Sequence, residues 1–224
     1  MTGDRPPELE APVDLIATHG YGDSAVVWSA LLAALAELTR GQVKPQAWDL
    51  PGHGDRRGEP PGSHDIGTAT EELRRRAVDC PRPPVLLGHS LGGYLSLRCA
   101  LTTDVPLRAV VVVSSGPGFR DPRARAEWNA TMDRLAVALG LPAETSAIAH
   151  MTDGLVLERL PAGRVPALVV RGAADRPQYQ AGAAVIAERW PGARLIDIPG
   201  AGHEPHRTHA ANVAGAIARF LDLN

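Results

Sequence analysis

Short apolar runs bounded by glycine and proline alternate along this chain with stretches of helical periodicity, and this alternation restricts the possible folds more than any other feature. The strongest run, LRAVVVVS at residues 107–114, has four consecutive valines, which is typical of a strand covered on both faces of a sheet. Five further apolar runs predict strands at residues 13–17, 44–50, 85–87, 167–171 and 194–198. Residues 7–12 are a candidate for an additional, irregular edge strand.

Helical periodicity occupies most of the intervals between these strands. The apolar spacing predicts helices at residues 24–39, 68–78, 94–101, 180–189 and 209–221. Strands that alternate with helices in this way form right-handed βαβ units and a parallel sheet. We therefore expect an α/β fold with a mostly parallel sheet of about six strands and with helices on both faces.

The pattern changes over residues 116–164, where strand-like runs are missing. Two helical stretches are expected there, near residues 122–139 and 143–160. We interpret 116–164 as a short helical cap inserted into a core that is formed by residues 1–115 and 165–224. Its length of about fifty residues predicts a small lid over the edge of the sheet.

Composition excludes several classes of protein. The chain has 224 residues, 44% of them hydrophobic, and a formal net charge of −2, which gives no basic footprint for nucleic acid. Its two cysteines, Cys80 and Cys99, do not make a disulfide framework. The polar, proline-rich N-terminus has no signal-like apolar segment, and no run approaches the roughly 20 apolar residues that span a bilayer. We expect a cytoplasmic protein.

Unusual short stretches follow several of the predicted strands directly. HGYG at residues 19–22, DLPGHG at 49–54, GHSLG at 88–92, AAD at 173–175 and GAGH at 200–203 all occupy such positions. Because ligands bind at the carboxyl ends of strands in parallel sheets, these stretches are expected to converge on one rim.

Three residues at this rim have side chains that could act together in one reaction. A serine hydroxyl is a weak nucleophile and needs a base within hydrogen-bond reach, so Ser90 with His203 would form a nucleophile and its general base. Asp175 would orient the imidazole and stabilise its protonated form. Other acids remain competitors for this last role, namely Asp104, Asp121, Asp153 and Asp197.

These motifs resemble those of the α/β-hydrolase family. GHSLG is similar to the nucleophile elbow Gly-x-Ser-x-Gly in its strand–turn–helix context, and Ser90, Asp175 and His203 follow the family order of serine, acid and histidine. His19-Gly20 resembles the oxyanion-loop motif, and the likeness extends over about residues 13–222. It implies that the backbone N–H groups of Tyr21 and Leu91 receive the oxyanion and that no cofactor is required.

The resemblance implies a serine hydrolase that cleaves a carboxylic ester or thioester through an acyl-enzyme. The substrate would be a small molecule or an acyl group bound to a carrier. Alternatives with the same fold and triad are lactone or C–C hydrolysis, acyl transfer and elimination in a biosynthetic pathway. A catalytically inactive, ligand-binding member is a further alternative.

A second set of residues is expected near the substrate, with core packing as the alternative for the larger ones. The predicted pocket lining consists of His19, Gly20, His89, Trp128, Met132 and Met151. The ring of Tyr21 could lie over the bound substrate. His203, His206 and His209 are spaced by three, but Pro205 interrupts any helix that would align them, so no metal site is expected.

Overall fold

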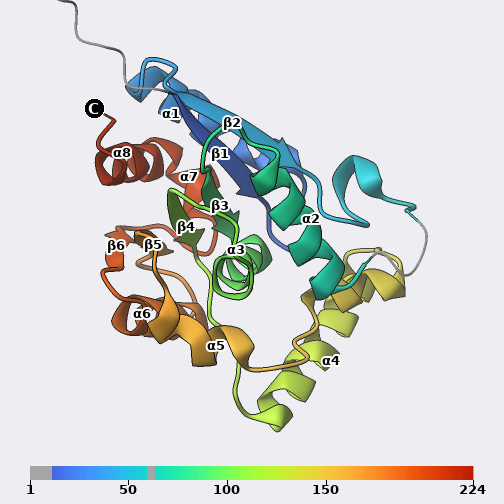
Figure 1. Cartoon of the computed structure of the whole chain (residues 1–224). Helices are drawn as coiled ribbons and strands as arrows, with labels where there is room; N and C mark the ends of the chain where they lie inside the picture. The colour runs from blue at the N-terminus through green and yellow to red at the C-terminus, as the bar shows by residue number, and fades with distance from the viewer. Residues whose placement is uncertain (1–11, 60–63, 224) are drawn as a thin grey trace, which may run out of the picture.

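The computed structural model describes residues 12–59 and 64–223, and its centre is a six-stranded parallel sheet (Figure 1). The strand order is β2-β1-β3-β4-β5-β6, and every neighbouring pair is parallel. The strands are β1 (Val13–Thr18), β2 (Val43–Trp48), β3 (Val85–His89), β4 (Ala109–Val113), β5 (Ala167–Gly172) and β6 (Arg194–Ile198). All six predicted strands are therefore present, whereas the additional edge strand expected at 7–12 falls almost entirely outside the described residues.

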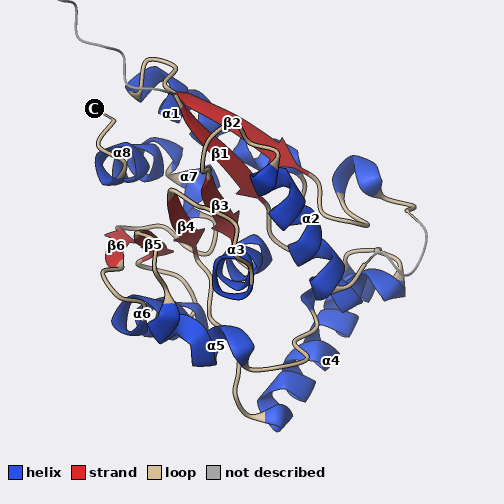
Figure 2. Cartoon of the chain, viewed as in Figure 1, coloured by secondary structure: helices blue, strands red, loops and turns tan. Residues whose placement is uncertain are grey.

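Helices cover both faces of the sheet (Figure 2). One face carries α2 (Ile66–Val78), α3 (Leu91–Thr102) and α6 (Pro177–Arg189), and the other carries α1 (Ser29–Leu38) and α8 (Ala210–Phe220). A 3-10 turn, η1 (Ala25–Trp28), precedes α1, and the short helix α7 (Pro205–Thr208) precedes α8.

The valines of β4 show how the sequence pattern produces these layers. Val110 and Val112 pack into the core beneath α2, α3 and α6, whereas Val111 and Val113 pack into the core beneath α1 and α8. All four are fully buried, because successive side chains of a strand point to opposite faces and both faces are covered.

No strand forms in the described residues between β4 and β5. This segment contains α4 (Pro122–Ala138), η3 (Ala143–Ala149), α5 (Leu155–Arg159) and η4 (Leu160–Ala162). The expected helix at 143–160 is wrong, since the chain forms a 3-10 run there, then an extended stretch, then a single short helix.

Hydrogen bonds that involve side chains explain why no continuous helix forms over residues 143–160. Asn129 in α4 donates to the Met151 carbonyl (3.3 Å) and accepts from the Met151 N–H (2.8 Å), which holds that residue outside a helix. The hydroxyls of Thr145 and Ser146 donate to carbonyls three residues back, at 2.7 and 2.8 Å, and favour the tighter 3-10 winding.

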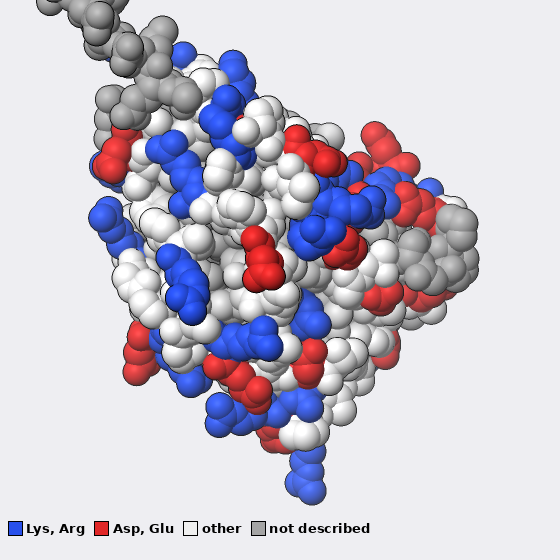
Figure 3. Space-filling model, in the orientation of Figure 1, with Lys and Arg blue, Asp and Glu red and all other residues white. Residues whose placement is uncertain are grey.

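Charged side chains of both signs are interspersed on the face shown in Figure 3, as 23 basic and 25 acidic residues lead one to expect. Of the helices in the described part of the chain, none combines the length and apolar content needed to cross a bilayer.

Buried side chains of the central strand β3 should contribute strongly to stability. Leu86 is fully buried in the core beneath α2 and α3, so Leu86→Ala is expected to lower the free energy of unfolding by about 2–5 kcal/mol. Val78→Ala, at a position that is 54% exposed, should change it by less than about 0.5 kcal/mol. Urea denaturation of both variants measures the difference, and equal effects would contradict this account of the core.

Candidate active site

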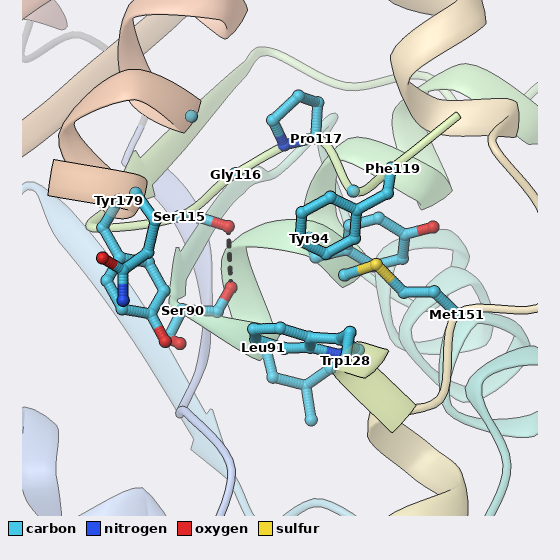
Figure 4. A pocket seen from close by; sticks show the side chains of 13 residues that line it. Ser90, Leu91, Tyr94, Ser115, Gly116, Pro117, Phe119, Trp128, Met151 and Tyr179 are labelled. Atoms are coloured by element: carbon cyan, nitrogen blue, oxygen red, sulfur yellow. Dashed lines mark hydrogen bonds between the residues drawn. The ribbon is translucent and has the colours of Figure 1, made fainter. Parts of the chain in front are cut away.

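The candidate nucleophile Ser90 lies at the sharp bend between β3 and α3. Its φ and ψ are 49° and −111°, in a left-handed region that costs a non-glycine residue about 1–3 kcal/mol. Two hydrogen bonds hold it there. The Ser90 N–H donates to the Val113 carbonyl at 3.0 Å, and Ser115 Oγ donates to the Ser90 carbonyl at 2.7 Å (Figure 4). The bend therefore projects the hydroxyl from the rim of the sheet.

The glycines around Ser90 are required by close backbone approach. A Cβ at Gly88 would collide with the backbone of Gly92 across the bend, and a Cβ at Gly92 would collide with the Thr18 carbonyl in β1. The sequence GHSLG thus allows α3 to start directly after the strand and to pack tightly against the sheet.

His203 and Asp175 form a hydrogen-bonded pair beside this bend. Asp175 follows β5 and has a fully buried side chain, while His203 lies in the loop after β6 and is 21% exposed. His203 Nδ1 lies 3.0 Å and 3.2 Å from the two Asp175 carboxylate oxygens. A carboxylate can only accept, so Nδ1 carries the proton and Nε2 keeps a lone pair that can act as a base.

Aromatic rings fix the orientation of this imidazole. The Tyr179 ring lies 4.0 Å and the His89 ring 5.0 Å from the His203 ring, centroid to centroid. Ser90 and His203 line the same hollow. Within residues 12–59 and 64–223 the Ser90 hydroxyl makes no hydrogen bond, and such contacts commonly tighten only when substrate binds.

The loop after β1 is held by the ring of His19. His19 Nδ1 donates to the Gly20 carbonyl at 2.7 Å, and its Nε2 accepts from the Leu50 N–H at 3.0 Å. Burial lowers the pKa of His19 and keeps it neutral, as this pair of bonds requires. In a trans peptide the N–H points opposite to the carbonyl, so the same contact aims the Tyr21 N–H away from His19.

Two hollows meet at Ser90. The first is lined by Ser90, Leu91, Tyr94, Ser115, Gly116, Pro117, Gly118, Phe119, Trp128, Met151, Gln178, Tyr179 and Gly182 (Figure 4). The second is lined by Gly20, Tyr21, Asp23, His89, Ser90, Leu91, Trp128, Met132, Leu135, Ala149, Arg176, Tyr179, His203 and Glu204. Trp128, Met132 and Met151 come from the segment between β4 and β5, which therefore lies over the rim.

Most residues expected in the pocket lie on these walls. Gly20, His89, Trp128 and Met132 line the second hollow, and Met151 lines the first. His19 does not line these walls. Its ring is fully buried and connects the loop after β1 to Leu50, away from the surface that a substrate would touch. The Tyr21 hydroxyl lies 3.3 Å from Thr145 Oγ1 of η3, which connects the loop after β1 to the segment above it.

Two parts of the site were not predicted from the sequence. The stretch after β4, Ser115 to Phe119, forms one wall of the first hollow, and its SGPGF sequence at a strand end was an available signal. Tyr179, which lines both hollows and packs on His203, sits in the first turn of α6, where no local pattern distinguishes it.

The remaining histidines near Ser90 are neutral packing groups. His89 Nε2 donates to the His203 carbonyl at 3.0 Å, and the His206 ring lies between those of His89 (4.2 Å) and Trp28 (4.8 Å). Burial lowers the pKa of His89 far below its ordinary value and that of His206 to about 3. Across the described ranges, no group of three or more His, Cys, Asp or Glu side chains is placed to hold a metal.

Residues 15–216 match the model of the alpha/beta hydrolase family, and the chain therefore belongs to that family. This makes the protein an enzyme of the hydrolase class. The chain is 25% identical to the pimeloyl-acyl-carrier protein methyl ester esterase of Yersinia pseudotuberculosis, covering 96% of this chain and 95% of the relative. The esterase with the same name from Edwardsiella ictaluri is also 25% identical, over 93% of each chain.

Solved structures agree on the fold. MenH from S. aureus superposes with a TM-score of 0.81 at 19% identity, covering 96% of this chain and 95% of that one. An esterase from Thermogutta terrifontis gives a TM-score of 0.79 at 19% identity, covering 95% and 90%. The overall fold of this chain is thus shared with these solved structures.

The buried histidines predict a loss of stability in acid. His206 has a pKa of about 3 in the folded protein, where burial is the main cause, against about 6.5 when unfolded. Below pH 6.5 the unfolded chain therefore binds more protons, and stability falls as pH falls. At pH 5 this one group should reduce the free energy of unfolding by about 2 kcal/mol.

His206→Phe tests this directly, because neither ring nitrogen has a hydrogen-bond partner in the described part of the chain. Urea denaturation at pH 5 and pH 7 should show a smaller pH-dependent loss for the variant than for the native protein. Equal losses would contradict the assignment of His206 as a buried neutral ring.

Proposed function

We propose that this enzyme cleaves a carboxylic ester or a thioester through an acyl-enzyme on Ser90. The observation that carries the proposal is the Asp175–His203 pair, at 3.0 Å, where His203 lines the same hollow as Ser90 on its strained bend. A buried carboxylate, an oriented imidazole and a partly exposed hydroxyl are the groups that acyl transfer requires. The esterase names of the relatives that cover nearly the whole chain support the same reaction.

The reaction follows from the positions of these groups. His203 Nε2 takes the proton of Ser90 Oγ as the oxygen attacks the carbonyl carbon of the substrate, and the imidazolium then gives that proton to the departing alcohol or thiol. Water repeats the sequence on the acyl-enzyme and releases the carboxylic acid. Asp175 remains ionised and stabilises the imidazolium, so the cycle closes without a cofactor.

The N–H groups of Tyr21 and Leu91 are the proposed oxyanion donors. Leu91 is the first residue of α3, where an N–H has no partner within the helix and lies at the positive end of the helix dipole. Because the Gly20 carbonyl is hydrogen-bonded to the His19 ring, the Tyr21 N–H of the same peptide points away from that ring. One such donor is typically worth about 3–4 kcal/mol in the transition state.

The segment 116–164 would act as a small lid, since its residues line both hollows over Ser90. The relatives are named for the methyl ester of a carrier-bound acid. We include an acyl group bound to a carrier protein among the candidate substrates, together with small free esters and thioesters.

Ser90→Ala is the experiment that tests the proposal. The variant should lose at least about 10³-fold in kcat for a short p-nitrophenyl ester, because the nucleophile is removed. Ser29→Ala removes an exposed hydroxyl from α1, outside both hollows, and should stay within about tenfold of the native enzyme. Thermal melting of both variants establishes that they are folded.

Asp175→Asn is a second test of the mechanism. It retains the shape of the side chain but no longer stabilises the imidazolium, so kcat should fall by about 10²–10⁴-fold. Native-like turnover in either Ser90→Ala or Asp175→Asn would remove that residue from the mechanism.

A further inference from the structure

The two hollows that meet at Ser90 differ in chemistry, and the difference bears on the substrate. They share Ser90, Leu91, Trp128 and Tyr179, so a carbonyl bound at Ser90 would send one substituent into each. His203 lines only the second hollow. The inference drawn from this asymmetry rests on the proposed acyl-enzyme mechanism.

The position of His203 decides which substituent enters which hollow. The imidazolium must protonate the departing oxygen or sulfur, so the leaving group lies on the side of His203, in the second hollow. The acyl chain must then occupy the first hollow. We propose that the enzyme selects esters of uncharged, apolar carboxylic acids whose alcohol or thiol component is polar.

The first hollow is suited to an apolar chain. None of the described residues that line it is charged, and Leu91, Phe119, Trp128 and Met151 supply much of its wall (Figure 4). The Ser115 hydroxyl is already donated to the Ser90 carbonyl. An ionised carboxylate on the acyl chain would lose its hydration there without gaining a charged partner.

Met151 and Tyr94 close the side of this hollow next to Gly118. Gly118 has a φ of 81°, and a Cβ there would lie 3.1 Å from both Met151 Sδ and Tyr94 Cε2. Both side chains are nearly fully buried. The thioether of Met151 therefore limits the acyl chain that fits, and shortening this side chain should lengthen the space.

The second hollow carries ionised groups. Asp23, Arg176 and Glu204 line it, and Arg207 lies 3.2 Å from Glu204 and 3.9 Å from Asp23. The Arg176 guanidinium lies over the Tyr179 ring at 4.7 Å. A polar leaving group can exchange hydrogen bonds with these side chains, whereas Met132, Leu135 and Ala149 give the same hollow an apolar part.

A panel of p-nitrophenyl esters with one leaving group and varied acyl chains tests the proposal. From acetyl to hexanoyl, kcat/KM should rise by roughly fourfold per methylene until the hollow is full. Replacing the terminal methyl by a carboxylate at matched chain length should lower kcat/KM by at least about tenfold. Equal rates for the two hexanoyl-length esters would overturn the proposal, and this comparison needs no variant.

Met151→Ala and Met132→Ala form a matched pair, because both methionines come from the segment 116–164 and each lines only one hollow. Met151→Ala should move the preferred acyl chain to greater length, whereas Met132→Ala should leave the acyl preference unchanged and alter the preference among leaving groups. A shift of acyl preference by Met132→Ala alone would overturn the assignment of the hollows.

The outcomes separate this inference from the mechanism. If Ser90→Ala abolishes turnover but the charged acyl chain is preferred, the acyl-enzyme mechanism survives and the selectivity is wrong. If Ser90→Ala retains native turnover, the mechanism itself fails.

Discussion

The backbone of Ser90 is held in a left-handed conformation, and the candidate site depends on this bend. Strain of about 1–3 kcal/mol is offset locally by the bonds to the Val113 carbonyl and from Ser115 Oγ. The glycines at 88 and 92 let β3, α3 and β1 approach closely enough to keep the bend rigid. The two hollows share this residue, so the bend fixes the point at which they meet.

Electrostatics around the bend distinguish one histidine from its neighbours. His19, His89 and His206 are buried and their pKa values are lowered by desolvation, so each is a neutral ring with a structural role. His203 alone among these four has a carboxylate partner on Nδ1 and lies partly exposed at the hollow. The same burial makes these three histidines a source of acid sensitivity, since they take up protons in acid when the chain unfolds.

Much of the fold was predictable, because strands buried on both faces, such as β4, are read from apolar runs and strand ends converge by topology. That rule also placed Ser90, Asp175 and His203 on one rim. The break at Met151 was not predictable, since it depends on a contact from Asn129 in α4. The role of His19 and the contact of Tyr179 with His203 likewise depend on tertiary neighbours, which local periodicity does not encode.

The most direct test is to locate the acyl group on the protein. Native enzyme quenched in acid during turnover of an activated ester should gain the mass of one acyl group, and peptide mapping should place it on the fragment that contains Ser90. His203→Ala should not accumulate this adduct at the native rate, because nothing then takes the proton from the hydroxyl. Acylation at another residue, or turnover with no covalent adduct under rapid quenching, would contradict the mechanism.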